Sequence, residues 1–233
     1  MSLESYIYIA TLIASVLAIW AQIKVSTTFN KYSRTPTATN RTADQVARMI
    51  LDNNGLSDVR IERVRGSLSD HYDPRSKVLR LSDTVYGKRS AAAIGVAAHE
   101  AGHAIQHAEK YAPIEWRAKL VPVVNFASRF SWIAIMLGLF ISYASIILGD
   151  YVVGFGIVLF AATTLFHLVT LPCEFNASRR ALAELDMTGW YSHSELGMSK
   201  KVLTAAAMTY VAALATSVIQ LLRLIRIFGN RRD

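Results

Sequence analysis

The sequence is poor in cysteine: Cys173 is the only one among its 233 residues. A single cysteine excludes an internal disulfide, so nothing argues for an oxidising compartment. The N-terminus also lacks a basic segment, since Glu4 is the only charge ahead of the first apolar run, and no small-residue cleavage site follows that run. These absences favour a retained signal anchor over a removed signal peptide.

Two long stretches lack any charged residue, one from Phe130 to Leu148 and one from Tyr151 to Leu171. Only Gly149-Asp150 separates them, so we predict a helical hairpin that crosses the bilayer and returns. A first apolar run from about Tyr6 to Ile23 has the length of one more spanning helix. A hydrophobic content of 52% and a positive mean hydropathy of +0.28 agree with lipid contact.

Negative charge is scarce relative to positive charge, and the formal net charge is +8. No DNA- or RNA-binding motif accompanies this excess, so we expect anionic lipid rather than nucleic acid beside the basic residues. The charges after the first apolar run are all positive up to residue 41, and the positive-inside rule therefore places the N-terminus outside and the next segment in the cytoplasm. The basic residues in question are Lys24, Lys31, Arg34, Arg41 and Arg48.

A further apolar segment, Val202 to Leu222, permits two interpretations. It is apolar enough to span a membrane, but its alanine-rich stretch also suits a buried helix. Spanning would place the four following arginines outside, against the charge rule, so we favour a buried or membrane-surface helix. Those arginines are Arg223, Arg226, Arg231 and Arg232.

The stretch between residues 42 and 109 has the pattern of a small mixed domain. Thr42 is a plausible N-cap and Gly55 a stop signal for one helix, and residues 90–109 are alanine-rich and free of proline, which predicts a second, longer helix. Residues 59–64 and 77–81 alternate as strands do. The second of these strands is either an edge that pairs with an extended peptide or an ordinary interior strand.

The predicted long helix carries His99-Glu100-Ala101-Gly102-His103. Residues four apart lie on the same helical face, so His99 and His103 can both direct ring nitrogens at one zinc ion. Glu100 lies about 100° around the helix, close enough to take a proton from a water that the metal activates. Alanine and glycine at 101 and 102 keep the helix slim where another element must pack closely.

A catalytic zinc site needs a third protein ligand and one open position. The extended motif with a later glycine and histidine fails, because Gln106 and Glu109 stand at those positions. His107 lies about 12 Å along the helix from His99, too far to share the ion. Glu174, where the hairpin should re-emerge, is our candidate for the third ligand. The rivals are Glu109, Glu115, Glu184 and Glu195, while Cys173 fits packing better than ligation.

Three segments together resemble a known family, the membrane zinc metallopeptidases described as YugP-like. They are SDHYDPRSKVLRLSD, HEAGHAIQH and LPCEFNASRRA, and the resemblance runs from about residue 1 to 225. It implies a zinc peptidase with His99, His103 and Glu174 as ligands and Glu100 as the catalytic glutamate. The chain is more distantly similar to membrane proteases of the HtpX and Ste24 type.

Two positions depart from the motif of those relatives. Asn176 and Ser178 stand where the family pattern commonly has an aspartate, so the carboxylate that would orient a zinc histidine is not obvious. Asp186 and Asp83 are candidates to replace it. For the donor that assists the developing oxyanion, the candidates are Tyr210, Arg179, Arg180 and His193, while His71 fits a substrate role only if it lies near the cleft.

We therefore expect a mainly helical fold with a small β-hairpin or sheet, arranged as in gluzincin metalloproteases, with a membrane hairpin between the motif helix and the third-ligand helix. The expected divisions are an anchor at 1–25, a cytoplasmic peptidase part at 26–128, a transmembrane hairpin at 129–172 and a helical region at 173–233. The expected activity is zinc-dependent cleavage of peptide or protein substrates, with misfolded or membrane proteins as candidates, at the cell membrane. The alternative is a zinc-binding membrane adaptor or chaperone that hydrolyses nothing.

Overall fold

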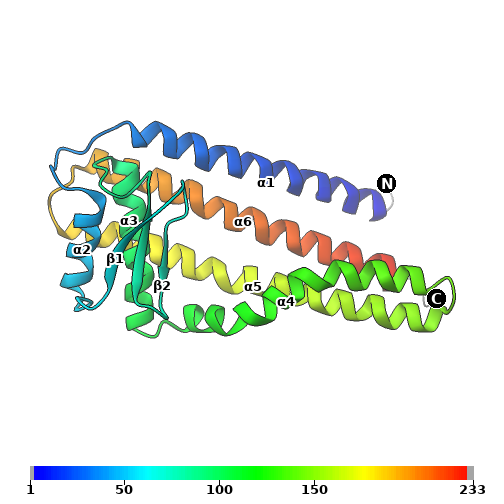
Figure 1. The fold of residues 1–233 in the computed structure, drawn as a ribbon. Coiled ribbons are helices and arrows are strands. Elements are labelled where there is room, and N and C mark those ends of the chain that lie inside the picture. The colour runs from blue at the N-terminus through cyan, green and yellow to red at the C-terminus, as the bar shows by residue number, and fades with distance from the viewer. Residues whose placement is uncertain (1–2, 230–233) are drawn as a thin grey trace. The chain divides into compact units, whose positions relative to one another are not determined.

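A computed structural model of the chain describes residues 3–229 and is mainly helical, with one small sheet (Figure 1). In chain order the elements are α1 (Leu3–Ser33), α2 (Ala43–Asn53), β1 (Arg60–Val64), β2 (His71–Asp73), β3 (Val78–Ser82), α3 (Ala91–Ala108), α4 (Ala112–Ile141), α5 (Ile146–Met187) and α6 (His193–Gly229).

The chain forms two compact units, and several helices contribute to both. The first, here called the apolar unit, takes the described residues up to Trp20, Trp116–Leu171 and the described residues from Tyr210 onward. The second, here called the sheet unit, takes Ala21–Glu115 and Pro172–Thr209. All the residues of the zinc motif and its candidate third ligand belong to the sheet unit.

The three strands lie in the order β1-β3-β2, with β3 parallel to β1 and antiparallel to β2. Pairing on both sides makes β3 the central strand, so the alternative of an ordinary interior strand is confirmed and the edge alternative is wrong. The second neighbour is β2, a three-residue strand at His71–Asp73 that is too short for an alternation pattern to reveal. The edges of the sheet are β1 and β2.

Helix α3 is the centre of the sheet unit. Ser90 caps it, because the Ser90 Oγ accepts a hydrogen bond from the backbone N–H of Ala93 at 3.3 Å. Its alanine-rich faces are buried against α2 and the sheet, in one hydrophobic core that includes Ile50, Leu79 and Leu185. Burial of nearly the whole helix holds the motif residues in fixed directions.

The apolar unit contains the two charge-free stretches, but their turn lies earlier than predicted. Helix α4 ends at Ile141 and α5 begins at Ile146, so the turn is at residues 142–145, and Gly149 lies inside α5. A Cβ at Gly149 would lie 2.7 Å from the carbonyl oxygen of Gly138. Glycine at 149 is therefore needed for close helix packing, which a sequence pattern cannot distinguish from a turn.

Four helices among the described residues are long and apolar enough to cross a membrane, judged by length and composition. They are Ser5–Ser33, Ala112–Ile141, Ile146–Met187 and His193–Gly229. The last contains the segment 202–222 that the sequence left between two interpretations. Many large apolar side chains of the apolar unit are exposed, including Phe140 and Val158, as expected of a surface that faces lipid.

Candidate metal centre

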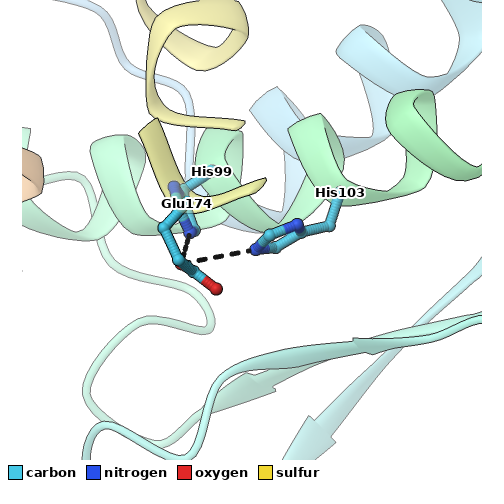
Figure 2. A group of neighbouring side chains, drawn as sticks. All are labelled: His99, His103 and Glu174. Atoms are coloured by element: carbon cyan, nitrogen blue, oxygen red, sulfur yellow. Dashed lines mark hydrogen bonds and ion pairs between the residues drawn. The ribbon is translucent and has the colours of Figure 1, made fainter. Parts of the chain in front are cut away.

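Helix α3 presents His99 and His103 on one face, one turn apart (Figure 2). Their ring centroids are 4.7 Å apart and the ring planes meet at 83°, so each ring has its own direction of approach to the space between them. Both side chains are largely buried, with 14% and 9% of their surfaces exposed. The four-residue spacing thus acts as the sequence predicted, bringing two imidazoles together.

Glu174 on α5 meets the two imidazoles (Figure 2). Its Oε2 lies 3.2 Å from His99 Nε2 and 3.7 Å from His103 Nε2, and its side chain is only 3% exposed. One ligand atom from each residue lies within 4.8 Å of the others. Tetrahedral zinc with ligand bonds near 2 Å needs donors about 3.3 Å apart, so small shifts suffice for all three to bind one ion.

The opposite nitrogen of each histidine contacts a neutral side chain. His99 Nδ1 lies 3.1 Å from Ser178 Oγ, and His103 Nδ1 lies 2.9 Å from Gln106 Oε1. Partners of this kind orient metal-binding imidazoles and raise their basicity. From the sequence a carboxylate was expected in this role, and neither Ser178 nor Gln106 was identified. Residues three apart on a helix are neighbours, so the position of Gln106 three residues after His103 is the signal that could have found it.

The two carboxylates that the sequence offered instead lie elsewhere. Asp83 accepts hydrogen bonds from Arg63 and from the backbone of Gly66, which hold the pKa of Asp83 below its ordinary value. Asp186 forms no hydrogen bond or ion pair with either histidine. A serine and a glutamine therefore contact the histidines where a carboxylate was expected.

Gly102 explains how α5 comes so close to the motif helix. A Cβ at this position would lie 2.7 Å from the backbone oxygen of Ala177. Without a side chain at 102, the two backbones can approach closely enough for Glu174 and Ser178, on the same stretch of α5, to reach His99. This agrees with the expected slim face of the helix.

Glu100, which follows His99 in the sequence, is buried, with 8% of its surface exposed. Its carboxylate forms no hydrogen bond or ion pair with any residue in the described range 3–229. A buried carboxylate without a structural partner is costly unless it has a ligand or a proton to bind. Glu100 thus differs from the other glutamates nearby.

The rival glutamates have other structural partners. Glu109 forms an ion pair with Arg180 at 2.5 Å, and this guanidinium holds the pKa of Glu109 below its ordinary value. Glu184 accepts a hydrogen bond from Asn54, and Glu195 accepts hydrogen bonds from the backbones of Ser192 and Ala38. Glu115 does not belong to the group of residues that can hold a metal among the described residues.

The other residues named from the sequence lie at separate places. His107 is half-buried and packs against Tyr72 of β2, with ring centroids 5.8 Å apart. Cys173 is buried, and its carbonyl oxygen accepts a hydrogen bond from Gln106. Arg179 and His193 are exposed, and Tyr210 belongs to the apolar unit. His71 is exposed on β2, with Nδ1 at 2.9 Å from the Ser69 carbonyl oxygen.

Comparisons with known proteins agree with a zinc site. The family described as "Putative neutral zinc metallopeptidase" matches residues 7–229. The chain is 48% identical over 223 residues to "Putative membrane protease YugP" of Bacillus subtilis (strain 168), and the match covers 96% of each chain. No solved structure matches the chain significantly.

Proposed function

The chain belongs to the family described as "Putative neutral zinc metallopeptidase", and from this membership we propose that it is a membrane-anchored, zinc-dependent endopeptidase. One observation carries the proposal: three side chains that suit zinc converge within 4.8 Å beside a buried glutamate without a recorded structural partner. His99, His103 and Glu174 are the proposed ligands. Two histidines and a glutamate are a donor set of catalytic zinc sites, which keep a fourth position open.

Glu100 is the proposed general base. Zinc, when bound here, supplies a Lewis acid and lowers the pKa of water at the open position towards neutrality. A carboxylate oxygen of Glu100 would take the proton from the water that attacks the peptide carbonyl, and would then pass it to the leaving amine. Glu100 is buried, which keeps bulk water away from this transfer.

The edge of β2 is the proposed binding strand for substrate, in place of β3. It lies beside the motif helix, since Tyr72 packs on His107, and its outer side is unpaired among the described residues. A peptide added along this edge would be held by backbone hydrogen bonds, with little dependence on its sequence. This suits a protease of extended, unfolded protein segments, at a membrane whose lipid is the second partner.

The membrane arrangement is a proposal from the same observations. We place α4 and the first part of α5 as a transmembrane hairpin between the motif helix and Glu174, in a gluzincin-like order, and α1 as the anchor. The C-terminal half of α6 belongs with them to the apolar unit, where Thr216 lies 3.5 Å from the Ala14 carbonyl oxygen, which favours a fourth span over a surface helix. The basic residues after α1 favour a cytoplasmic sheet unit.

The test pairs metal analysis with proteolysis on the full chain in detergent. Wild type and Glu100→Gln are each incubated with an unfolded protein, and zinc is measured in both. We expect about one zinc per chain in each, and a loss of about 10²- to 10⁴-fold in cleavage rate for the variant. Equal cleavage by both would refute the role of Glu100. Zinc in both with no cleavage by either would favour the adaptor alternative.

A further inference from the structure

A line of polar side chains leads from the surface of the sheet unit to His103. At its outer end Arg180 pairs with Glu109, and the Arg180 Nε donates a hydrogen bond to Asn176 Oδ1 at 2.7 Å. The Gln106 Nε2 donates to the same Asn176 oxygen at 2.9 Å. The Gln106 Oε1 in turn lies 2.9 Å from His103 Nδ1. Four consecutive contacts therefore connect a surface ion pair with a proposed metal ligand.

The donor and the acceptor of each hydrogen bond in this line can be assigned by starting from Arg180 at its outer end. A guanidinium has donors only, so the Asn176 atom that faces Arg180 must be the amide oxygen. That oxygen can only accept, and the Gln106 atom facing it must therefore be the amide nitrogen. The same nitrogen also donates to the Cys173 carbonyl oxygen at 2.8 Å. Rotating the Gln106 amide by 180° would set its oxygen against two other oxygens.

With its nitrogen held in this way, Gln106 can offer only its oxygen to His103. Nδ1 of His103 must then carry a proton, so in the neutral imidazole Nε2, which faces Glu174, holds the lone pair. Gln106 is completely buried, so water cannot replace a lost partner of its amide. His99 has no comparable constraint, because its partner Ser178 bears a hydroxyl that either donates or accepts.

We propose that Gln106 is a positioning residue that fixes the tautomer of His103, and that Asn176 and Arg180 fix the amide of Gln106. This inference rests on the proposed role of His103 as a zinc ligand. A neutral amide here does what a carboxylate does in many zinc sites: it holds the imidazole with Nε2 bare for the metal. Asn176 thereby connects Arg180 with Gln106: its oxygen, held by Arg180, requires the amide nitrogen of Gln106 to face it.

Two substitutions at position 176 test the relay. Asn176→Leu keeps the size but removes the acceptor shared by Arg180 and Gln106, whereas Asn176→Asp keeps an oxygen acceptor at that place. Asn176 is only half-buried, so both variants should fold. Gln106→Met is the inner counterpart, because it fills the same volume without any polar atom. The full-length protein in detergent is used throughout.

The first readout is the tautomer in metal-free protein. The chain has six histidines, so ¹⁵N spectra of histidine-labelled protein are simple. At about pH 8, where free imidazoles are neutral, we expect His103 as the Nδ1–H tautomer in wild type and Asn176→Asp. A mixture of tautomers is expected in Asn176→Leu and in Gln106→Met. Wild-type His103 with its proton on Nε2 would overturn the proposal.

The second readout is zinc affinity, measured by competition with a chelating dye. We expect a loss of about 10- to 100-fold for Asn176→Leu and Gln106→Met, and none for Asn176→Asp. Unchanged affinity in both disrupted variants would overturn the relay. His103→Ala separates this from a failure of the proposed function: full zinc binding by that variant would show that His103 is not a ligand, whatever Gln106 does.

Discussion

The two units of the molecule satisfy their buried polar side chains in different ways. In the apolar unit, hydroxyl groups mostly bond to the backbone of their own helix, three or four residues back: Thr163 and Thr164 to the Phe160 carbonyl, and Ser142 to that of Gly138. In the sheet unit, polar side chains bond between elements, as Gln106 of α3 does with Asn176 of α5. Local bonds suit a helix in lipid, whereas bonds between elements fix one particular arrangement of side chains.

Close helix packing, in contrast, uses the same device in both units. Gly156 of α5 lets the backbone of Ser131 on α4 come close, just as Gly102 of α3 lets the backbone of Ala177 on α5 come close. In the apolar unit such contacts bring apolar surfaces together, and in the sheet unit they bring the proposed zinc ligands together. Glycine allows two helices to approach closely in both units, and the side chains beside it determine which groups are brought together. Matched substitutions in the two units test this difference at Glu174, Gly102 and Ser178.

The largest expected effect is at Glu174. Glu174→Gln keeps the size of the side chain but removes the charge that complements a divalent ion, so zinc affinity should fall by more than the roughly 100-fold typical of outer partners. Cleavage should be lost with the metal. Thr163→Val, which removes a polar group from the same helix α5 in the apolar unit, should change neither quantity. Metal analysis and dye competition measure zinc affinity, and digestion of an unfolded protein measures cleavage. Tight zinc binding by Glu174→Gln would return the third-ligand role to one of the rival glutamates.

Glycine to alanine in each unit gives the next effect. Gly102→Ala and Gly156→Ala both force a Cβ within 3 Å of backbone atoms of a neighbouring helix, and overpacking of this kind costs about 1 to 3 kcal/mol. Both should lower the thermal unfolding midpoint. Only Gly102→Ala should also weaken zinc binding, because it separates Glu174 from the histidines. Gly154→Ala, where nothing lies within 4 Å of the added Cβ, is the control: it should not lower the midpoint, because alanine favours the helix, and it should leave zinc binding unchanged. A loss of zinc affinity in Gly156→Ala would break the comparison.

The local parts of the fold were predictable from sequence, because each has a local cause. Ser90 and the alanine-rich run fixed the motif helix, and the spacing of His99 and His103 fixed their common face. The family resemblance supplied Glu174, which local pattern left among several glutamates. The contacts of Ser178 and Gln106 could not be predicted, since they depend on how closely α5 approaches α3. The same applies to β2, whose three residues give no periodic pattern, and to Gly149, whose role depends on Gly138.

Ser178→Ala should have a smaller effect than the glycine change. It removes the hydroxyl that lies 3.1 Å from His99 Nδ1, and zinc affinity should fall by about 10-fold, the lower end for such partners. The effect is small because a hydroxyl does not fix one tautomer of His99 and water can replace it at a side chain that is partly exposed. Ser217→Ala is the matched change in the apolar unit, where the hydroxyl bonds only to the Leu214 carbonyl of its own helix. Competition with a chelating dye measures the zinc affinity of both variants. Equal affinities in Ser178→Ala and Ser217→Ala would contradict the prediction.

The smallest effect concerns the acid stability of the sheet unit. Hydrogen bonds from Ser76 Oγ at 2.6 Å and from the Arg75 backbone lower the pKa of Asp73, at the end of β2, from 3.8 to about 2. The folded state thus binds this proton less readily than the unfolded state. The stabilisation is therefore complete above about pH 4 and is lost as the pH falls towards 2. Ser76→Ala removes the main cause of the shift, so its unfolding midpoint should fall less than that of wild type between pH 5 and pH 3. Equal falls in the two proteins would mean that Asp73 does not stabilise the β2–β3 turn through its charge.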